Sequence, residues 1–162
     1  NELELEELIV KANSNDNINF LNEVFLDKKI ADIKKITEFD RWNYLHRILC
    51  YFNPSLELVR FYINNGLDIN AQDKYGMTPL HYAMRSKNVD AAIALLNAGA
   101  NPNIQNQDNL VPLSILGGDS NTVNQSAQMA RRMEKFNRQL HPTKKQRIKD
   151  LAKEIAYQVM QI

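Results

Sequence analysis

Few residues of this 162-residue chain are of the types that usually carry out chemistry, since it has three histidines and one cysteine. His46 lies four residues before Cys50, so on a helix the imidazole would lie on the face of the thiol and could take its proton. No third side chain that would orient the imidazole is apparent. His46 and His81 are 35 residues apart, which is not the spacing of two metal ligands. The sequence therefore predicts no catalytic residue, no metal and no cofactor, and we expect a protein that is not an enzyme.

The overall composition is that of a folded, nearly neutral protein. Hydrophobic residues make up 44% and charged residues 24% of the chain, and the formal net charge is +1, which is far less basic than a chain that binds nucleic acid along its whole length. No apolar stretch is long enough to cross a membrane, and the acidic start is unlike a secretory signal. A lone cysteine leads us to expect an intracellular, reducing compartment, the cytoplasm or the nucleus. The first residue is Asn1 rather than Met, and we expect an excised or processed product.

The sequence repeats itself with a period of about 33 residues. The segment 66–70, Gly-Leu-Asp-Ile-Asn, recurs 33 residues later as Gly-Ala-Asn-Pro-Asn at 99–103. Thr-Pro-Leu-His at 78–81 likewise recurs as Val-Pro-Leu-Ser at 111–114, and a weaker copy, Asn-Tyr-Leu-His, stands at 43–46. Such a period is typical of repeat proteins, in which units that cannot bury their apolar faces alone stack on their neighbours.

The central copy predicts a turn followed by two short helices. Gly76 can adopt the positive φ of a turn, Thr78 suits the cap of a helix and Pro79 suits its first position. A second helix is predicted over 89–98, ended by Gly99. In the third copy Asn109 replaces the turn glycine, which Asn tolerates. Because glycines 117 and 118 follow its apolar residues, we expect the first helix of that copy to be short.

This pattern resembles the ankyrin repeat family, on the strength of Thr-Pro-Leu-His-Tyr-Ala at 78–83, the 33-residue period and the closing segment at 99–103. The resemblance implies an all-α solenoid of helix-turn-helix units, in which His46 and His81 hydrogen-bond between neighbouring turns. We expect an ankyrin-repeat domain over residues 1–125. Its units would span about 1–35, 36–70, 71–103 and 104–125, the first and last degenerate.

Residues 126–162 do not follow the repeat, and we expect them to form a helical C-terminal extension. An apolar stripe at helical spacing predicts a cap on the last repeat, or alternatively a helix that binds a partner or a second copy. The segment 130–154 has nine basic and three acidic residues, a net charge of +6. It suits an acidic partner, a nuclear-import receptor or an anionic surface, or is a solvated helix face. The candidate basic patch is Arg131, Arg132, Lys135, Arg138, Lys144, Lys145 and Arg147.

The resemblance also implies a concave groove, lined by the turn tips and the exposed side of each first helix, that binds another protein. The positions that map to it are Trp42, Tyr51, Lys74, Tyr75, Met77, Arg85, Ser86, Asp108 and Leu110. Several are large and aromatic or basic, the types enriched at interface hot spots. Trp42 either packs against a neighbouring turn or contacts the partner. For Tyr75 and Met77 we favour a contact surface that the packing between repeats does not need.

The function expected from this resemblance is recognition of a partner protein, with no small-molecule substrate. The chain is rich in Asn and Ile, which indicates an AT-rich genome. Proteins that resemble this one from such genomes are often effectors of intracellular bacteria or viral factors, so we expect such a protein, delivered into a host cell. One alternative is the targeting module of a larger enzyme whose catalytic domain lies elsewhere. Another is an anchor that binds anionic membrane or nucleic acid through the basic C-terminal helices.

Overall fold

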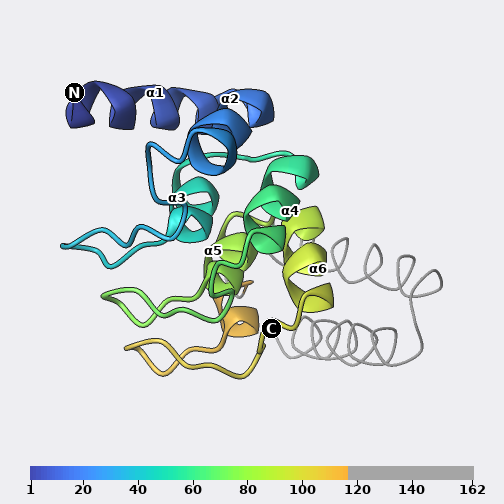
Figure 1. The fold of residues 1–162 in the computed structure, drawn as a ribbon. Helices are drawn as coiled ribbons and strands as arrows, with labels where there is room; N and C mark the ends of the chain where they lie inside the picture. The colour runs from blue at the N-terminus through green and yellow to red at the C-terminus, as the bar shows by residue number, and fades with distance from the viewer. Residues whose placement is uncertain (117–162) are drawn as a thin grey trace.

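The computed structural model describes residues 1–116, and within that range it is all-helical (Figure 1). The elements are α1 (Glu2–Ser14), α2 (Ile18–Asn22), the π-helical turn η1 (Glu23–Asp27), α3 (Tyr44–Tyr51), α4 (Leu56–Asn64), α5 (Pro79–Arg85), α6 (Val89–Asn97) and the 3-10 helix η2 (Pro112–Leu116). The predicted extension over 126–162, with its apolar stripe and basic patch, lies outside the described residues. The unit boundaries proposed above stay predictions.

The helices begin where the sequence offers a capping side chain. Thr78 accepts a hydrogen bond from the His81 N–H at the start of α5, and Pro79 is the first helical residue, as predicted. Asn43 caps α3 in the same way. The second helix of the central copy ends at Asn97, one residue before the predicted end, and Gly99 follows with φ +105°. These local signals make each of the two central units a pair of short helices, α3 with α4 and α5 with α6.

The third copy also forms as predicted up to the last described residue. Asn109 adopts φ +61° in its turn, the conformation that Gly76 adopts with φ +76° in the turn before it. Within the described residues the first helix of this copy is a 3-10 segment, Pro112–Leu116. Its Leu113 is buried at the position that Leu80 and Leu45 occupy in the preceding units. All three leucines belong to one continuous core that runs between the units.

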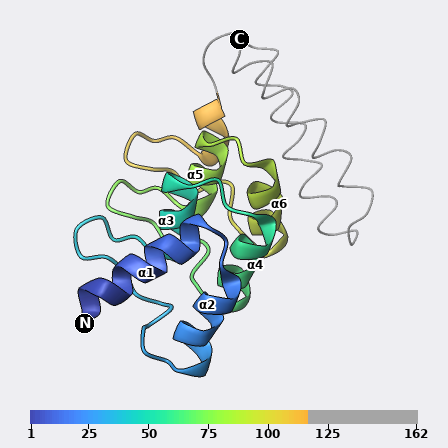
Figure 2. The same cartoon turned by 90° about the horizontal axis from the view of Figure 1, so that it is seen from above.

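Three turns project from one side of the stack, and α4 and α6 lie on the other side (Figures 1 and 2). Each turn is closed by a backbone hydrogen bond of 2.9 Å between its ends, and the turns span 37–42, 73–77 and 106–110. Each turn also bonds to the next, because Lys74 N–H donates to the Asp40 carbonyl at 2.9 Å and Gln107 N–H donates to the Tyr75 carbonyl at 3.0 Å. We call the surface made by these turns and the adjacent sides of α3 and α5 the loop face.

Gly76 is needed where two turns meet. Besides its positive φ, a Cβ atom at this position would lie 2.9 Å from the backbone nitrogen of Gln107. Backbone atoms in a bonded turn cannot move aside as a flexible side chain can. The close approach of the turns over 73–77 and 106–110 therefore fixes the shape of the loop face.

Candidate functional site

The two buried histidines connect neighbouring turns. The His46 Nδ1 atom accepts a hydrogen bond from the Asn43 N–H at 3.0 Å, and its Nε2–H donates to the Ala71 carbonyl at 2.8 Å. His81 repeats this arrangement between the Thr78 N–H at 3.0 Å and the Leu110 carbonyl at 2.9 Å. Because Nδ1 accepts from a backbone N–H, the ring proton lies on Nε2 and the imidazole is neutral. Both nitrogens of each ring are used in hydrogen bonds, so His46 and His81 join neighbouring turns as the resemblance implied.

Burial lowers the pKa of both imidazoles. For His46 the loss of hydration is the largest influence, and the hydrogen bond to the Ala71 carbonyl opposes it only in part. The pKa of His81 is lowered for the same reason, against the hydrogen bond to the Leu110 carbonyl. Neither ring is poised as a base for the thiol of Cys50, whose Sγ instead accepts a hydrogen bond from Arg85 Nη2 at 3.4 Å.

Asp73 is a buried carboxylate that organises the second turn. Its Oδ1 atom accepts from the N–H groups of Tyr75 at 2.9 Å and Met77 at 2.8 Å. Its Oδ2 atom accepts from Trp42 Nε1 at 2.8 Å and from the Tyr82 hydroxyl. Burial and the hydrogen bond to this carboxylate raise the pKa of the Tyr82 phenol. Sequence reasoning missed Asp73, although an Asp three residues before a turn glycine is the signal of a side chain that bonds its own turn.

A hollow of about 420 Å³ lies on the loop face beside Asp73. The side chains that line it come from α3, α5 and the three turns: Trp42, Cys50, Tyr75, Met77, Tyr82, Arg85, Asn106, Gln107 and Asp108. Five of the positions predicted to contact a partner meet here, namely Trp42, Tyr75, Met77, Arg85 and Asp108. We call this cavity the loop-face hollow.

Trp42 and Met77 line this hollow but are mostly buried, with exposed fractions of 8% and 7%. Met77 belongs to the core, and its sulfur accepts a hydrogen bond from Asn106 Nδ2 at 3.3 Å. The expectation that packing between repeats does not need Met77 is therefore wrong. The physical reason is that the third turn folds over this side chain, a contact that the sequence of one unit cannot reveal.

The other four predicted contact residues do not line the loop-face hollow: Tyr51, Lys74, Ser86 and Leu110. Tyr51 is 66% exposed and packs edge-to-face on Trp42, with ring centroids 5.3 Å apart. Lys74 places its ammonium 3.5 Å from the ring centroid of Phe39. Leu110 is partly exposed. The hydroxyl of Ser86 donates to the Tyr82 carbonyl within its own helix at 2.9 Å, which occupies its one donor.

Two charged side chains of the loop-face hollow have no ion pair among the described residues. The guanidinium carbon of Arg85 lies 4.8 Å from the ring centroid of Tyr82, and no carboxylate of residues 1–116 comes within 4.0 Å of its nitrogens. Asp108 has no cation within that distance in the same part of the chain. The hollow thus combines aromatic walls with one unmatched positive and one unmatched negative group.

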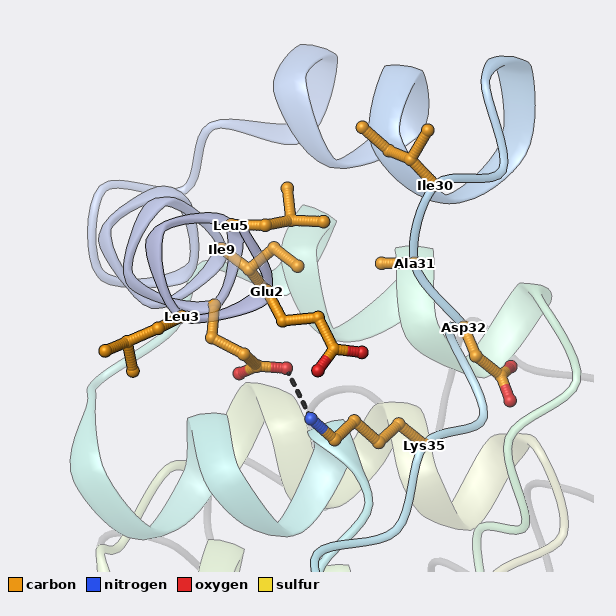
Figure 3. Close-up of a pocket in the computed structure, with 9 residues that line it drawn as sticks. Glu2, Leu3, Leu5, Ile9, Ile30, Ala31, Asp32 and Lys35 are labelled. Carbon is orange, nitrogen blue, oxygen red and sulfur yellow. Dashed lines mark hydrogen bonds and ion pairs between the residues drawn. The ribbon is translucent and has the colours of Figure 1, made fainter.

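A second hollow, of about 510 Å³, lies between α1 and the segment 30–35 (Figure 3). Leu5 and Ile9 form part of its apolar wall. Its cation, Lys35, is already paired, because the ammonium lies 2.9 Å from Glu6 Oε1. Burial alone would raise the pKa of Glu6, but the hydrogen bond with Lys35 and the attraction of Arg47 and Lys35 lower it overall. This hollow has no unmatched cation, and the loop-face hollow is the better candidate site.

Metal binding and membrane insertion find no support within residues 1–116. No group of three His, Cys, Asp or Glu side chains lies close enough to hold a metal ion in this part of the chain. None of its helices has the length and the apolar character that a membrane span requires.

Comparison with known proteins identifies the repeat. Residues 8–106, more than half of the chain, match the family model for ankyrin repeats in three copies. The chain belongs to the ankyrin repeat family. Ankyrin repeats are a repeat family and not an enzyme family, and they generally act as protein-binding modules.

Relatives and a solved structure agree with this assignment. The ankyrin repeat protein nuc-2 of Neurospora crassa is 34% identical over 92 residues, 56% of this chain and 8% of nuc-2. The ankyrin repeat protein FPV233 of Fowlpox virus is 44% identical over 70 residues, 42% of this chain and 13% of FPV233. The ankyrin repeat domain of Bcl-3 shares the fold, with a TM-score of 0.52, 23% identity, and coverage of 64% of this chain and 43% of that chain. This ankyrin repeat chain therefore spans a small part of the length of these two curated relatives.

Proposed function

We propose that this ankyrin repeat chain binds another protein through its loop face, with the loop-face hollow at the centre of the contact. The observation that carries the proposal is Arg85, which pairs with no carboxylate of residues 1–116 and lies in a cavity with aromatic walls. A cation left without a carboxylate on the surface of the free protein gains most when a partner supplies one in a site shielded from water.

Exposed aromatic residues next to the hollow support the same surface. Phe39, Tyr51 and Tyr75 have exposed fractions of 72%, 66% and 44%. Phe39 and Tyr75 belong to successive turns, and Tyr51 ends α3 beside Trp42. Exposed aromatic side chains in one region are typical of protein contacts, since they bury much area and lose little rotamer freedom.

We further propose that the partner is a host protein and that the chain acts in the reducing cytoplasm or nucleus of a host cell. The similarity to a protein of Fowlpox virus supports a host-directed role. The free thiol of Cys50 fits a reducing compartment. The rival reading, the targeting module of a longer protein, is favoured by the small share of nuc-2 that the chain covers. The mass of the natural protein distinguishes the two.

The test is a variant that changes exposed residues of the loop face and leaves the buried core unchanged. We expect Tyr51→Ala combined with Tyr75→Ala to weaken binding of the recovered partner by about 2 kcal/mol, about thirtyfold, because both exposed rings would be contact residues. The partner is recovered with the full chain as bait, and its affinity is then measured by titration calorimetry. Arg60→Gln on the outer helix α4 is the control and should bind as the wild type does. Unchanged affinity of the double variant, with an unchanged circular dichroism spectrum, would place the interface elsewhere.

A further inference from the structure

Arg85 is held in place before any partner arrives. Its guanidinium stacks over the Tyr82 ring, and one of its nitrogens, Nη2, donates to the Cys50 thiol at 3.4 Å. A thiol is a weak acceptor, and no stronger acceptor from the described residues competes for this side chain. A guanidinium fixed by stacking loses little rotamer freedom when it binds, and its planar fork fits a carboxylate.

The carboxylates in and beside the loop-face hollow, Asp108 and Asp73, do not satisfy Arg85. Asp73 is buried, and each of its two oxygens already accepts two hydrogen bonds, from Trp42, Tyr75, Met77 and Tyr82. Asp108 lines the same hollow but makes no ion pair within residues 1–116. Within residues 1–116 Arg85 is thus left without a carboxylate, which a binding partner would supply.

The rest of the hollow is suited to an apolar side chain. Trp42 and Met77 offer it apolar surface, and Tyr75 forms its rim with a ring that is 44% exposed. A concave cavity that combines apolar and aromatic walls with fixed polar and charged groups anchors a side chain by burial and orients it by charge.

From this geometry we infer that the loop-face hollow recognises an extended peptide segment with a bulky apolar residue close to an Asp or Glu. The apolar side chain enters the hollow and the carboxylate pairs with Arg85. Asp108 disfavours a second acid at the same anchor by like-charge repulsion. This inference rests on the proposed function and adds the chemistry of the partner.

The experiment is a selection of random 12-residue peptides displayed on phage against the full chain. We expect the selected peptides to share a large apolar residue within about two positions of an acid. One consensus peptide and its Glu→Gln or Asp→Asn form are then titrated against the wild type, Arg85→Gln and Arg60→Gln. Neutralising the peptide acid should weaken binding to the wild type and to Arg60→Gln by about tenfold, and should change binding to Arg85→Gln by less than twofold.

The outcomes separate this inference from the proposed function. Peptides that lose binding to Tyr75→Ala but carry no acid would overturn the inference and keep the loop face as the binding surface. The same conclusion follows if neutralising the peptide acid weakens binding to Arg85→Gln as much as it weakens binding to the wild type. Peptides that bind Tyr75→Ala and the wild type equally would count against both. A selection that enriches no peptide would overturn the inference, since a preformed hollow for a short segment would capture one.

Discussion

At the scale of single residues, Asp73 does more for the turns than its place in the sequence suggests. Asn106, its counterpart in the third turn, accepts from the N–H groups of Asp108 and Leu110 through one oxygen, as Asp73 does from Tyr75 and Met77. An amide is therefore sufficient to shape a turn. What Asp73 adds is a second acceptor oxygen, which receives the Trp42 indole and the Tyr82 hydroxyl.

Asp73→Asn should therefore destabilise the protein by about 2–3 kcal/mol, since the amide NH₂ would face the buried Trp42 N–H, another donor. Urea unfolding followed by the fluorescence of Trp42, the only tryptophan, measures the change. Asp108→Asn, an exposed carboxylate without an ion pair in the described part of the chain, is the matched control and should change stability by less than about 0.5 kcal/mol. Equal stability of the two variants would mean that the Trp42 and Tyr82 contacts contribute nothing.

The buried histidines predict a dependence of stability on pH. Their pKa values are lowered in the folded protein from the ordinary 6.5, so below about pH 6.5 the unfolded chain binds protons that the folded chain does not. The stability that the neutral rings provide is complete above this pH and is lost as the pH falls toward the lowered folded pKa.

Between pH 7 and pH 5 the free energy of unfolding should fall, with each histidine contributing at most about 1.4 kcal/mol per pH unit. His81→Gln should be less stable than the wild type at pH 7.5 and should show a smaller loss toward pH 5. Chemical denaturation at a series of pH values gives both quantities. A wild-type stability that stays constant down to pH 5 would contradict the lowered pKa values.

At the scale of elements, the helices are held by the apolar faces that they share across units. Leu80 on α5 is fully buried in the core between α3 and η2, as its register with Leu45 and Leu113 predicted. Leu80→Ala should cost about 2–5 kcal/mol, because it leaves a cavity at two interfaces at once. Leu8→Ala, at a position of α1 that is 50% exposed, is the control. A loss below about 1 kcal/mol for Leu80→Ala, by urea unfolding, would mean that the unit register is wrong.

The sequence predicts features that arise within one repeat unit better than features that depend on contacts between units. Thr78, Pro79 and Asn109 act on their own backbone, so their types predicted caps and turns that the structure confirms. The burial of Met77 and the hydrogen bond of Asp73 with Trp42 depend on a neighbouring unit, and no pattern within one repeat reveals them. The π-helical turn over Glu23–Asp27 was also missed, since the degenerate first unit has the apolar spacing of an ordinary helix.

At the scale of the whole molecule, the described part of the stack, residues 1–116, is held by contacts between elements that are near neighbours along the chain. The principal contacts join helices of one unit or of adjacent units, as between α3 and α5 or α4 and α6. In such a molecule a terminal unit loses one interface when it opens and a central unit loses two.

Backbone amides of α1 should therefore exchange with deuterium faster than those of α3 and α5. Hydrogen exchange followed by mass spectrometry of peptic fragments measures this order. Exchange of the same fragments from the unfolded chain in denaturant serves as the reference for intrinsic rates. Equal protection of α1 and α5 would show that the stack opens only as a whole.

The bonds between turns have a consequence for how such a chain can change in evolution. The donor of one turn finds its acceptor about one repeat length away along the chain, as Gln107 finds Tyr75 and Lys74 finds Asp40. An in-frame duplication of 33 residues would therefore give the added unit a complete set of donors and acceptors from the moment it arose. The loop face would lengthen by one turn, and the new copies of Tyr75 and Arg85 would be free to diverge toward a new ligand while the original pair kept the old one.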